Sequence, residues 1–372
     1  MEYIEKLFKN AAAFELNAGT SRDFIEAMRE AVEFHRKNSK IYDGICSRNG
    51  FSFERDVKCE DDIHKIPHIM VNVFKEMKLL SVAESQITVS FTSSGTTGSK
   101  SQTNLDEISI SRQRFSRKST VESYGLAAYE TEVNYLCFSY DPDTGGAKGA
   151  AHTHTAYTSF AKAREVFYAI SRDENGEAKF KIDECIATLG RYAGSGIPLR
   201  ITGFPSFGYA ALKKLDEANK RFEFSHDSVL FSGGGWKLPG GDPISFDEYS
   251  DLVKRVLGIP CGRIRDVYGM IEHGIPYMTC DRGNFHVPVY SRVYAVDPAT
   301  AERLSYGQKG LLKLITPYIQ SVPAISVLST DYGIIEENCP CGIKTPYIIL
   351  KGRAGVKKYA GCGISAAQLL SR

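Results

Sequence analysis

A stretch rich in glycine and hydroxyl side chains, residues 91–101, constrains the fold of this chain most. It reads Phe-Thr-Ser-Ser-Gly-Thr-Thr-Gly-Ser-Lys-Ser and follows an apolar alternation at residues 87–91, which is typical of a loop leaving the end of a β-strand. Glycines let backbone N–H groups turn toward an anion, hydroxyls add donors, and Lys100 adds positive charge. The composition therefore predicts a phosphate-binding loop, and a flexible Gly/Ser/Thr connector is the alternative.

The spacing within this loop decides which type of phosphate loop it is. A Walker-type loop needs a glycine, four residues and then Gly-Lys-Ser/Thr, whereas here Gly95 and Gly98 are three positions apart and Lys100 follows Ser99. The Walker interpretation therefore fails. The run instead resembles the phosphate loop of the adenylate-forming superfamily, which includes acyl-CoA synthetases and luciferases. That resemblance implies nucleotide contacts for Thr92, Ser93, Ser94, Gly95, Thr96, Thr97 and Gly98.

The composition argues against several classes of protein. A chain of 372 residues, 42% hydrophobic and 24% charged, is long enough to bury a large core and has an ordinary globular balance. The net charge of +2 gives no electrostatic argument for nucleic acid, so a small-molecule substrate is expected. No run reaches the length of a membrane span or a signal-peptide core, which predicts a cytoplasmic protein. Nine cysteines without a secretory signal argue against a disulfide framework.

Strand and helix patterns alternate along much of the chain. Residues 1–60 are expected to be mainly helical, with Thr20 and Asp23 forming a capping box and Phe24 on the buried face that follows. The periodicity predicts strands at 135–140, 200–204, 228–232 and 264–267, and helices at 108–123, 158–170, 209–220 and 245–257. This alternation favours an α/β fold with a largely parallel central sheet. Short alternating runs after residue 285 suggest a smaller β-rich subdomain at 285–350.

Three glycines directly follow the expected strand at 228–232. Gly233, Gly234 and Gly235 precede Trp236, the only tryptophan. Glycines at the carboxyl end of a strand let a flat ligand lie against the backbone. A tight turn anchored by Trp236 is the alternative.

A second motif follows the strand at 264–267 and reads Tyr-Gly-Met-Ile-Glu-His from Tyr268 to His273. An aromatic ring supplies a stacking face, Gly269 allows close backbone approach, and the Glu272 carboxylate is a suitable magnesium ligand. His273, next to Glu272, is a further candidate site residue.

Four stretches occur in the order that the adenylate-forming superfamily uses. After the phosphate loop, residues 268–272 resemble Tyr-Gly-x-Thr-Glu, residues 329–331 stand in place of Thr-Gly-Asp, and residues 351–353 match the Gly-Arg that opens a hinge. The resemblance implies that Asp331 binds the ribose hydroxyls of ATP and that Arg353 begins the hinge. It also implies a large domain at 1–350 and a hinge with a short tail at 351–372, in place of the usual small C-terminal domain and its catalytic lysine. Ile271 and Thr330 depart from the superfamily motifs.

The whole chain is similar to one branch of the superfamily, the acyl-protein synthetase family of bacterial fatty acid reductase complexes. The shared features are Ile66-Pro67, Phe74-Lys75, the glycine-rich loop and Gly361-Cys362-Gly363. The resemblance implies that ATP and Mg²⁺ convert a fatty or other carboxylic acid to acyl-AMP, that Cys362 captures the acyl group as a thioester, and that a partner such as an acyl reductase receives it.

This chemistry assigns catalytic roles to three residues. Lys100 would neutralise phosphate charge, and Cys362, preceded by Lys357 and Lys358, would be the nucleophile because nearby ammonium groups favour the thiolate. His273 is the third candidate. An inert thiol on a frayed tail is the alternative for Cys362. Two other functions stay open, namely direct transfer of the acyl group to coenzyme A or an acyl carrier protein, and an inactive scaffold subunit.

Several other cysteines and histidines have weaker signals. The Cys339-Pro340-Cys341 pair would need two further ligands to hold a metal, for which the sequence offers Cys280, Cys261 and His286; a plain turn is the favoured interpretation. His152 and His154, two residues apart, would share one face of a strand and could line an acyl pocket, or they are solvated loop residues.

Overall fold

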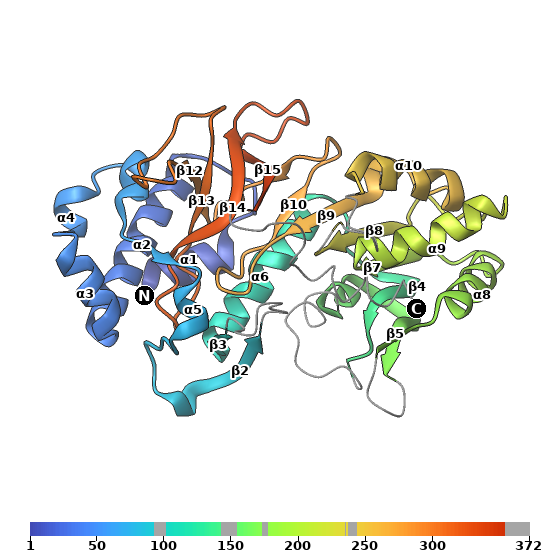
Figure 1. Cartoon of the computed structure of the whole chain (residues 1–372), viewed down its shortest axis with the longest axis horizontal. Coiled ribbons are helices and arrows are strands. Elements are labelled where there is room, and N and C mark those ends of the chain that lie inside the picture. The colour runs from blue at the N-terminus through green and yellow to red at the C-terminus, as the bar shows by residue number, and fades with distance from the viewer. Residues whose placement is uncertain (93–101, 143–154, 173–177, 235, 237–243, 354–372) are drawn as a thin grey trace.

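A mixed β-sheet of 13 strands runs through the molecule, seen here in a computed structural model (Figure 1). The structure describes residues 1–92, 102–142, 155–172, 178–234, 236 and 244–353. The strands lie in the order β12-β13-β14-β15-β11-β10-β9-β8-β7-β4-β5-β6, with β1 beside β14, and β2 and β3 form a separate antiparallel pair.

One half of the sheet is parallel, as the alternation of strands and helices predicts. Its parallel strands, in spatial order, are β5 (Ala161–Arg172), β4 (Ala128–Tyr140), β7 (Leu199–Gly203), β8 (Val229–Gly233) and β9 (Ile264–Tyr268). The short β6 (Ala178–Phe180) pairs antiparallel with β5 at the edge. The expected α/β fold with a largely parallel sheet is confirmed in this half.

The other half of the sheet is antiparallel. It consists of β10 (Tyr277–Thr279), β11 (Phe285–His286), β15 (Tyr347–Arg353), β14 (Ser326–Glu336), β13 (Lys309–Ile315) and β12 (Arg292–Val296), with β1 (Ile69–Met70) parallel to β14. The short alternating runs after residue 285 therefore do form strands. Pairing of β9 with β10 joins both halves into one sheet. The domain boundary at residue 350 and the β-rich subdomain at 285–350 stay predictions.

Helices cover both faces of the parallel half because side chains alternate along its strands. Leu230 of β8 packs in a core with α8 (Ile182–Ala193), α9 (Pro205–Glu217) and α10 (Phe246–Leu257). Its neighbours Val229 and Phe231 point the other way and share a core with Val121 of α6 (Glu107–Ser123). Figure 1 shows α8, α9 and α10 gathered at one end of the molecule.

The N-terminal helices cover the antiparallel half. They are α1 (Glu2–Asn10), α2 (Ala18–Asn38), α3 (Lys40–Arg48), α4 (Phe53–Asp56) and the later α5 (Val73–Glu76), with short 3₁₀ turns η1 (Glu60–Lys65), η2 (Glu84–Gln86) and η4 (Cys261–Arg263) elsewhere. On α2 the expected apolar face is buried, from Phe24 to Val32. Within the described residues, no helix is both long and apolar enough to cross a membrane.

Two local predictions are wrong. The helix α2 is capped by Asn17 and not by Thr20, because the Asn17 side chain accepts hydrogen bonds from the amides of Gly19 and Thr20 while the Thr20 hydroxyl accepts from the Asn17 amide. Thr20 therefore closes the capping box from inside the helix, and Asp23 has no part in it.

The second wrong prediction is the helix at 158–170. These residues form the end of a 3₁₀ turn, η3 (Ala156–Phe160), and most of strand β5. The segment contains alanine, lysine, arginine and glutamate, which favour helices. Parallel pairing with β4, from Ala128↔Ala161 to Tyr140↔Ile170, overrides that local preference. The strand before the glycine-rich loop, by contrast, is confirmed as β2 (Ile87–Thr92), which pairs with β3 (Gln102–Asp106).

Candidate functional site

The strand ends place some of the predicted site residues together. Gly233, the last residue of β8, pairs in register with Val267 of β9, so Gly233 and Gly234 lie beside Tyr268 at the carboxyl edge of the parallel strands. Thr92 is the last residue of β2. Ser93, Ser94, Gly95, Thr96, Thr97, Gly98, Lys100, Gly235, Cys362, His152 and His154 lie outside the described residues.

Tyr268, Asp331 and Arg353 form one hydrogen-bonded group. The Tyr268 hydroxyl donates to Asp331 Oδ2 at 3.0 Å, and Arg353 Nε donates to Asp331 Oδ1 at 2.7 Å. Arg353 and Asp331 are also direct partners across β14 and β15. Burial, with the charge of Asp331 adding to it, holds the pKa of Tyr268 well above its ordinary value, so the phenol stays protonated and donates.

The curvature of the sheet makes this contact possible. The strands β10, β11 and β15 separate β9, which carries Tyr268, from β14, which carries Asp331. In a flat sheet four strand spacings of about 4.8 Å would hold the two strands roughly 19 Å apart. Because the Tyr268 hydroxyl reaches the Asp331 carboxylate, the sheet must curl between β9 and β14.

The backbone conformation at Gly234, directly after β8, would be strained for any residue other than glycine. Gly234 has φ +101°, and a Cβ at this position would lie 2.9 Å from Cδ1 of Phe204. The tryptophan that follows is fixed by a hydrogen bond from Trp236 Nε1 to Asp266 Oδ2 at 2.8 Å. The turn is thus anchored by Trp236, as one interpretation of the glycine run expects. That a flat ligand lies against this backbone stays a prediction.

The turn after β9 carries Glu272 and His273, and both side chains are buried. His273 Nε2 lies 2.6 Å from the Tyr277 hydroxyl, which lies 2.7 Å from Ser291 Oγ, and Ser291 donates to the carbonyl of Ile315. Since that chain ends on an acceptor, Ser291 accepts from Tyr277 and Tyr277 accepts from His273 Nε2–H. Burial lowers the pKa of His273 to about 3, so the ring is neutral.

Asp266 lies beside the candidate site residues, and the sequence did not single it out. Its carboxyl accepts from Trp236, contacts Ser232 Oγ at 3.3 Å and accepts from the amide of Val267. Burial raises the pKa of Asp266 to about 7, against the lowering effect of these hydrogen bonds. The signal that would have found it is an acidic residue in the middle of the short strand Ile264–Tyr268, which the alternation predicts to be buried.

Comparisons with known proteins agree on the fold. At 15% identity, 2-hydroxyisobutyryl-CoA ligase in an open conformation with 2-HIB-AMP and CoA superposes with a TM-score of 0.63, over 92% of this chain and 76% of that one. The same ligase in the postadenylation state with R3-HIB-AMP gives a TM-score of 0.66 at 15% identity, over 92% of this chain and 69% of that one. These likenesses support the adenylate-forming type of α/β fold expected from the sequence.

Sequence comparisons identify the family. The chain is 24% identical over 351 residues to a "long-chain-fatty-acid--luciferin-component ligase" of Vibrio harveyi, covering 92% of this chain and 86% of that protein. It is also 24% identical to the protein of the same name from Aliivibrio fischeri, over 93% of this chain and 88% of that protein. The sequence model of the family "Acyl-protein synthetase, LuxE" matches residues 2–371 of this chain. This chain therefore belongs to the LuxE acyl-protein synthetase family.

Proposed function

We propose that this chain is an ATP-dependent acyl-protein synthetase that activates a fatty or other carboxylic acid. The carboxylate oxygen attacks the α-phosphorus of ATP, pyrophosphate leaves, and acyl-AMP forms. The observation that carries the proposal is the Tyr268–Asp331–Arg353 group in a chain matched by the family over residues 2–371. The names of the two curated relatives support a long-chain fatty acid as the substrate.

Asp331 is the proposed ribose ligand. A carboxylate offers about four lone-pair positions. The hydrogen bonds from Tyr268 and from Arg353 Nε take one on each oxygen, and Arg353 Nη2 also approaches Oδ2 at 3.5 Å. One ribose hydroxyl would take the open position on Oδ1, and the second would replace the long Arg353 Nη2 contact on Oδ2. Arg353 and Tyr268 would thus orient the carboxylate while Asp331 accepts from the sugar.

The adenine would lie between strand ends β8 and β9. Gly234 is exposed and carries no side chain, and the Tyr268 ring is held by stacking on Tyr277, with centroids 5.9 Å apart and planes at 27°. A ring fixed in this way offers a preformed aromatic surface beside the glycines. Gly269 continues the turn, and we propose that it allows close approach of the ligand to the backbone.

The phosphates would be held by the glycine-rich loop after β2 and by magnesium. Thr96, Thr97 and Lys100 supply hydroxyls and positive charge. Glu272, a residue only 5% exposed in the turn after β9, offers a hard carboxylate oxygen, the donor that magnesium prefers. Magnesium bound there would neutralise phosphate charge during the displacement.

The contacts of the neutral, buried His273 ring help to decide between a catalytic role and a positioning role. Its Nε2–H is committed to Tyr277, and its Nδ1 has no hydrogen-bond partner among the described residues. The network leads to Ser291 and the carbonyl of Ile315 and so fixes the turn that also carries Glu272. A catalytic part for His273 stays a prediction, and its contacts favour a positioning part.

Cys362 is the proposed acyl acceptor in the second step. Its thiolate attacks the acyl carbon of acyl-AMP, the carbon–sulfur bond forms, and AMP leaves with the electron pair of the broken carbon–oxygen bond. The thioester keeps the acyl group transferable to a partner protein such as an acyl reductase. Lys357 and Lys358 would favour the thiolate form.

The test is the intact mass of the purified protein after incubation with ATP, Mg²⁺ and fatty acids of graded length. We expect one acyl adduct that hydroxylamine removes and that Cys362→Ser abolishes. Cys59→Ser is the control, since it removes an exposed thiol far from Cys362 in the sequence and should leave the adduct unchanged.

Two other outcomes would separate the alternatives. AMP release without an adduct, accompanied by thioester formation on added coenzyme A or carrier protein, would establish a direct carboxylate ligase. Absence of ATP–pyrophosphate exchange with every acid tested would contradict the proposal and leave the scaffold function.

A further inference from the structure

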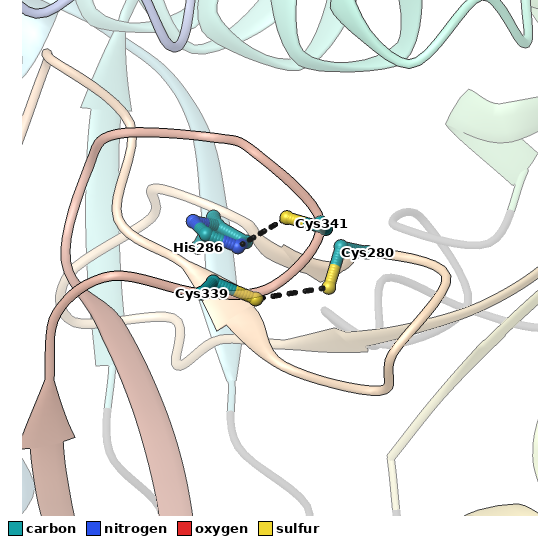
Figure 2. A group of neighbouring side chains, drawn as sticks. All are labelled: Cys280, His286, Cys339 and Cys341. Carbon is teal, nitrogen blue, oxygen red and sulfur yellow. Dashed lines mark hydrogen bonds between the residues drawn. The ribbon is translucent and has the colours of Figure 1, made fainter.

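Three cysteines and one histidine from distant parts of the chain gather in one buried cluster (Figure 2). Cys280 follows β10, His286 belongs to β11, and Cys339 and Cys341 lie between β14 and β15. Their four ligand atoms all lie within 4.8 Å of one another. Cys261, the other candidate in the sequence, is not a member of the cluster.

Two distances within the cluster are close to those of a tetrahedral site. Two thiolates bound to zinc at 2.3 Å are about 3.8 Å apart at the tetrahedral angle, and Cys280 Sγ lies 3.8 Å from Cys339 Sγ. Cys341 Sγ lies 3.2 Å from His286 Nε2, close to the roughly 3.5 Å expected for a sulfur–nitrogen pair. Figure 2 shows these side chains pointing toward one another.

The histidine is held in the form that binds a metal. His286 Nδ1 lies 3.1 Å from the carbonyl oxygen of Thr345, which only accepts hydrogen bonds. Nδ1 must therefore carry the proton, and Nε2 presents its lone pair to Cys341 and the rest of the cluster. A histidine whose second nitrogen donates to a carbonyl is the usual arrangement of a metal-bound imidazole.

Both cysteine loops have the same local shape. Each begins with a cysteine whose carbonyl accepts from the amide of a glycine three residues on, Gly283 after Cys280 and Gly342 after Cys339, at 3.1 Å in both. Both glycines have positive φ, +74° and +89°. These turns aim donors at sulfur: the Arg282 amide donates to Cys280 Sγ at 3.4 Å, and Asn284 Nδ2 donates to Cys339 Sγ at 3.2 Å.

We propose that Cys280, His286, Cys339 and Cys341 bind one zinc ion as a structural site. Three thiolates and one imidazole complete four-coordinate zinc and leave no open position for a substrate, which distinguishes this site from a catalytic one. The donors to sulfur compensate negative charge on the thiolates. The proposal is independent of the acyl-transfer chemistry, because none of the four residues belongs to the proposed ATP site.

The ion would join two chain segments that also contribute to the proposed ATP site. It ties the β10–β11 hairpin, which includes Tyr277, to the loop that precedes β15, which ends at Arg353. Since β11 and β15 share only two register pairs, Phe285↔Ile348 and His286↔Tyr347, a metal crosslink there would hold the curled part of the sheet together.

The first experiment measures metal in the purified full-length protein by inductively coupled plasma mass spectrometry, followed by X-ray absorption at the zinc edge. We expect about one zinc per chain, with three sulfur ligands at about 2.3 Å and one nitrogen at about 2.0 Å. Less than about a tenth of an equivalent in folded protein from zinc-supplemented medium, or another metal in its place, would overturn the proposal. A Cys280–Cys339 disulfide in the non-reduced protein would overturn it as well.

Variants test the ligand assignment. Cys339→Ser with Cys341→Ser should lose the zinc, whereas Cys261→Ser should keep it. Asn284→Ala, which removes only a donor to sulfur, should weaken zinc affinity by about tenfold in a competition with a chelator. If the double variant does not fold, cobalt substituted into the wild-type protein decides the matter, because only tetrahedral thiolate ligation gives intense visible d–d and sulfur-to-cobalt charge-transfer bands.

Discussion

At the scale of single residues, Asp331 joins three strands of the curled sheet through its two oxygens. Tyr268 donates from β9 and Arg353 donates from β15, while Asp331 itself stands on β14. Its side chain is 10% exposed and that of Arg353 is 49% exposed. The carboxylate is therefore sheltered while its partner Arg353 is half exposed.

We expect Asp331→Asn to lower kcat/KM for ATP in ATP–pyrophosphate exchange by about 10- to 100-fold, because hydrogen bonds to a charged group contribute about 1.5–3 kcal/mol. An amide also presents N–H groups where Arg353 donates. Asp297→Asn is the control, since that carboxylate accepts from the amides of a surface turn at Ala299 and Thr300 and from the Thr300 hydroxyl. Unchanged exchange in Asp331→Asn would contradict the proposed ribose contact.

Asp266 gives a prediction for pH. Its pKa is raised from 3.8 to about 7 by burial, so between these values the folded protein holds a proton that the unfolded chain has released. The free energy of unfolding should therefore fall as pH rises from about 4 to about 7, with a slope from this group of at most about 1.4 kcal/mol per pH unit. Asp266→Asn should remove that slope.

The single tryptophan reports the same titration directly. Because Trp236 Nε1 donates to Asp266 Oδ2, its fluorescence should change as the carboxyl loses its proton near pH 7. Asp247→Asn, an exposed carboxyl at the start of α10, serves as the control. A fluorescence profile that is the same with and without Asp266→Asn would refute the assignment.

At the scale of elements, the turn between β9 and β10 depends on Gly274. Its amide donates to the carbonyl of Met270 at 2.8 Å, and its φ is +72°. A Cβ there would lie 1.9 Å from the hydroxyl of Tyr318, whose ring is fully buried. This glycine lets a turn that carries Glu272 pack directly against the core.

Gly274→Ala should lower the free energy of unfolding by about 3 kcal/mol, the sum of a left-handed alanine at about 1 kcal/mol and overpacking at about 2 kcal/mol. Gly125→Ala isolates the two effects, because Gly125 has a similar φ of +65° with nothing near its Cβ position. It should cost only about 1 kcal/mol. Equal losses in urea unfolding of the two variants would show that Tyr318 gives way and that packing is not the cause.

At the scale of the whole molecule, α1 is joined to distant parts of the chain by an ion pair. Arg112 of α6 donates to Glu5 Oε1 at 2.6 Å through Nη2 and to the carbonyl of Tyr318 at 3.1 Å through Nη1. The Arg112 side chain is 5% exposed and that of Glu5 is 38% exposed. The pair connects the N-terminal helices with both α6 and the antiparallel half of the sheet.

Glu5→Gln should lower the free energy of unfolding by about 1–2 kcal/mol, because it leaves a buried guanidinium with a weaker acceptor. Glu2→Gln is a matched control, since Glu2 is exposed and stands in the same first turn of α1. It should change the free energy by less than about 0.5 kcal/mol. Equal effects would mean that the first turn, and not Arg112, accounts for the loss.

Much of the element order could be read from the sequence, because periodicity is a local property. The strands that contain residues 135–140, 200–203, 229–232 and 264–267 follow from short apolar runs, and the covered face of α2 follows from its spacing. The segment at 158–170 could not be read this way, since its residues favour a helix and only pairing with β4 makes it a strand.

What the sequence by itself determined is the alternation of strands and helices, the glycine-rich loop after β2 and the motifs that mark the family. What only the tertiary structure decided is which of those motifs meet. Tyr268 reaches Asp331 across 63 residues because the sheet curls, and Cys280 meets Cys339 across 59 residues because β11 pairs with β15. Such contacts depend on strand register and sheet curvature, which are set by packing over the whole molecule and leave no periodic trace in the chain.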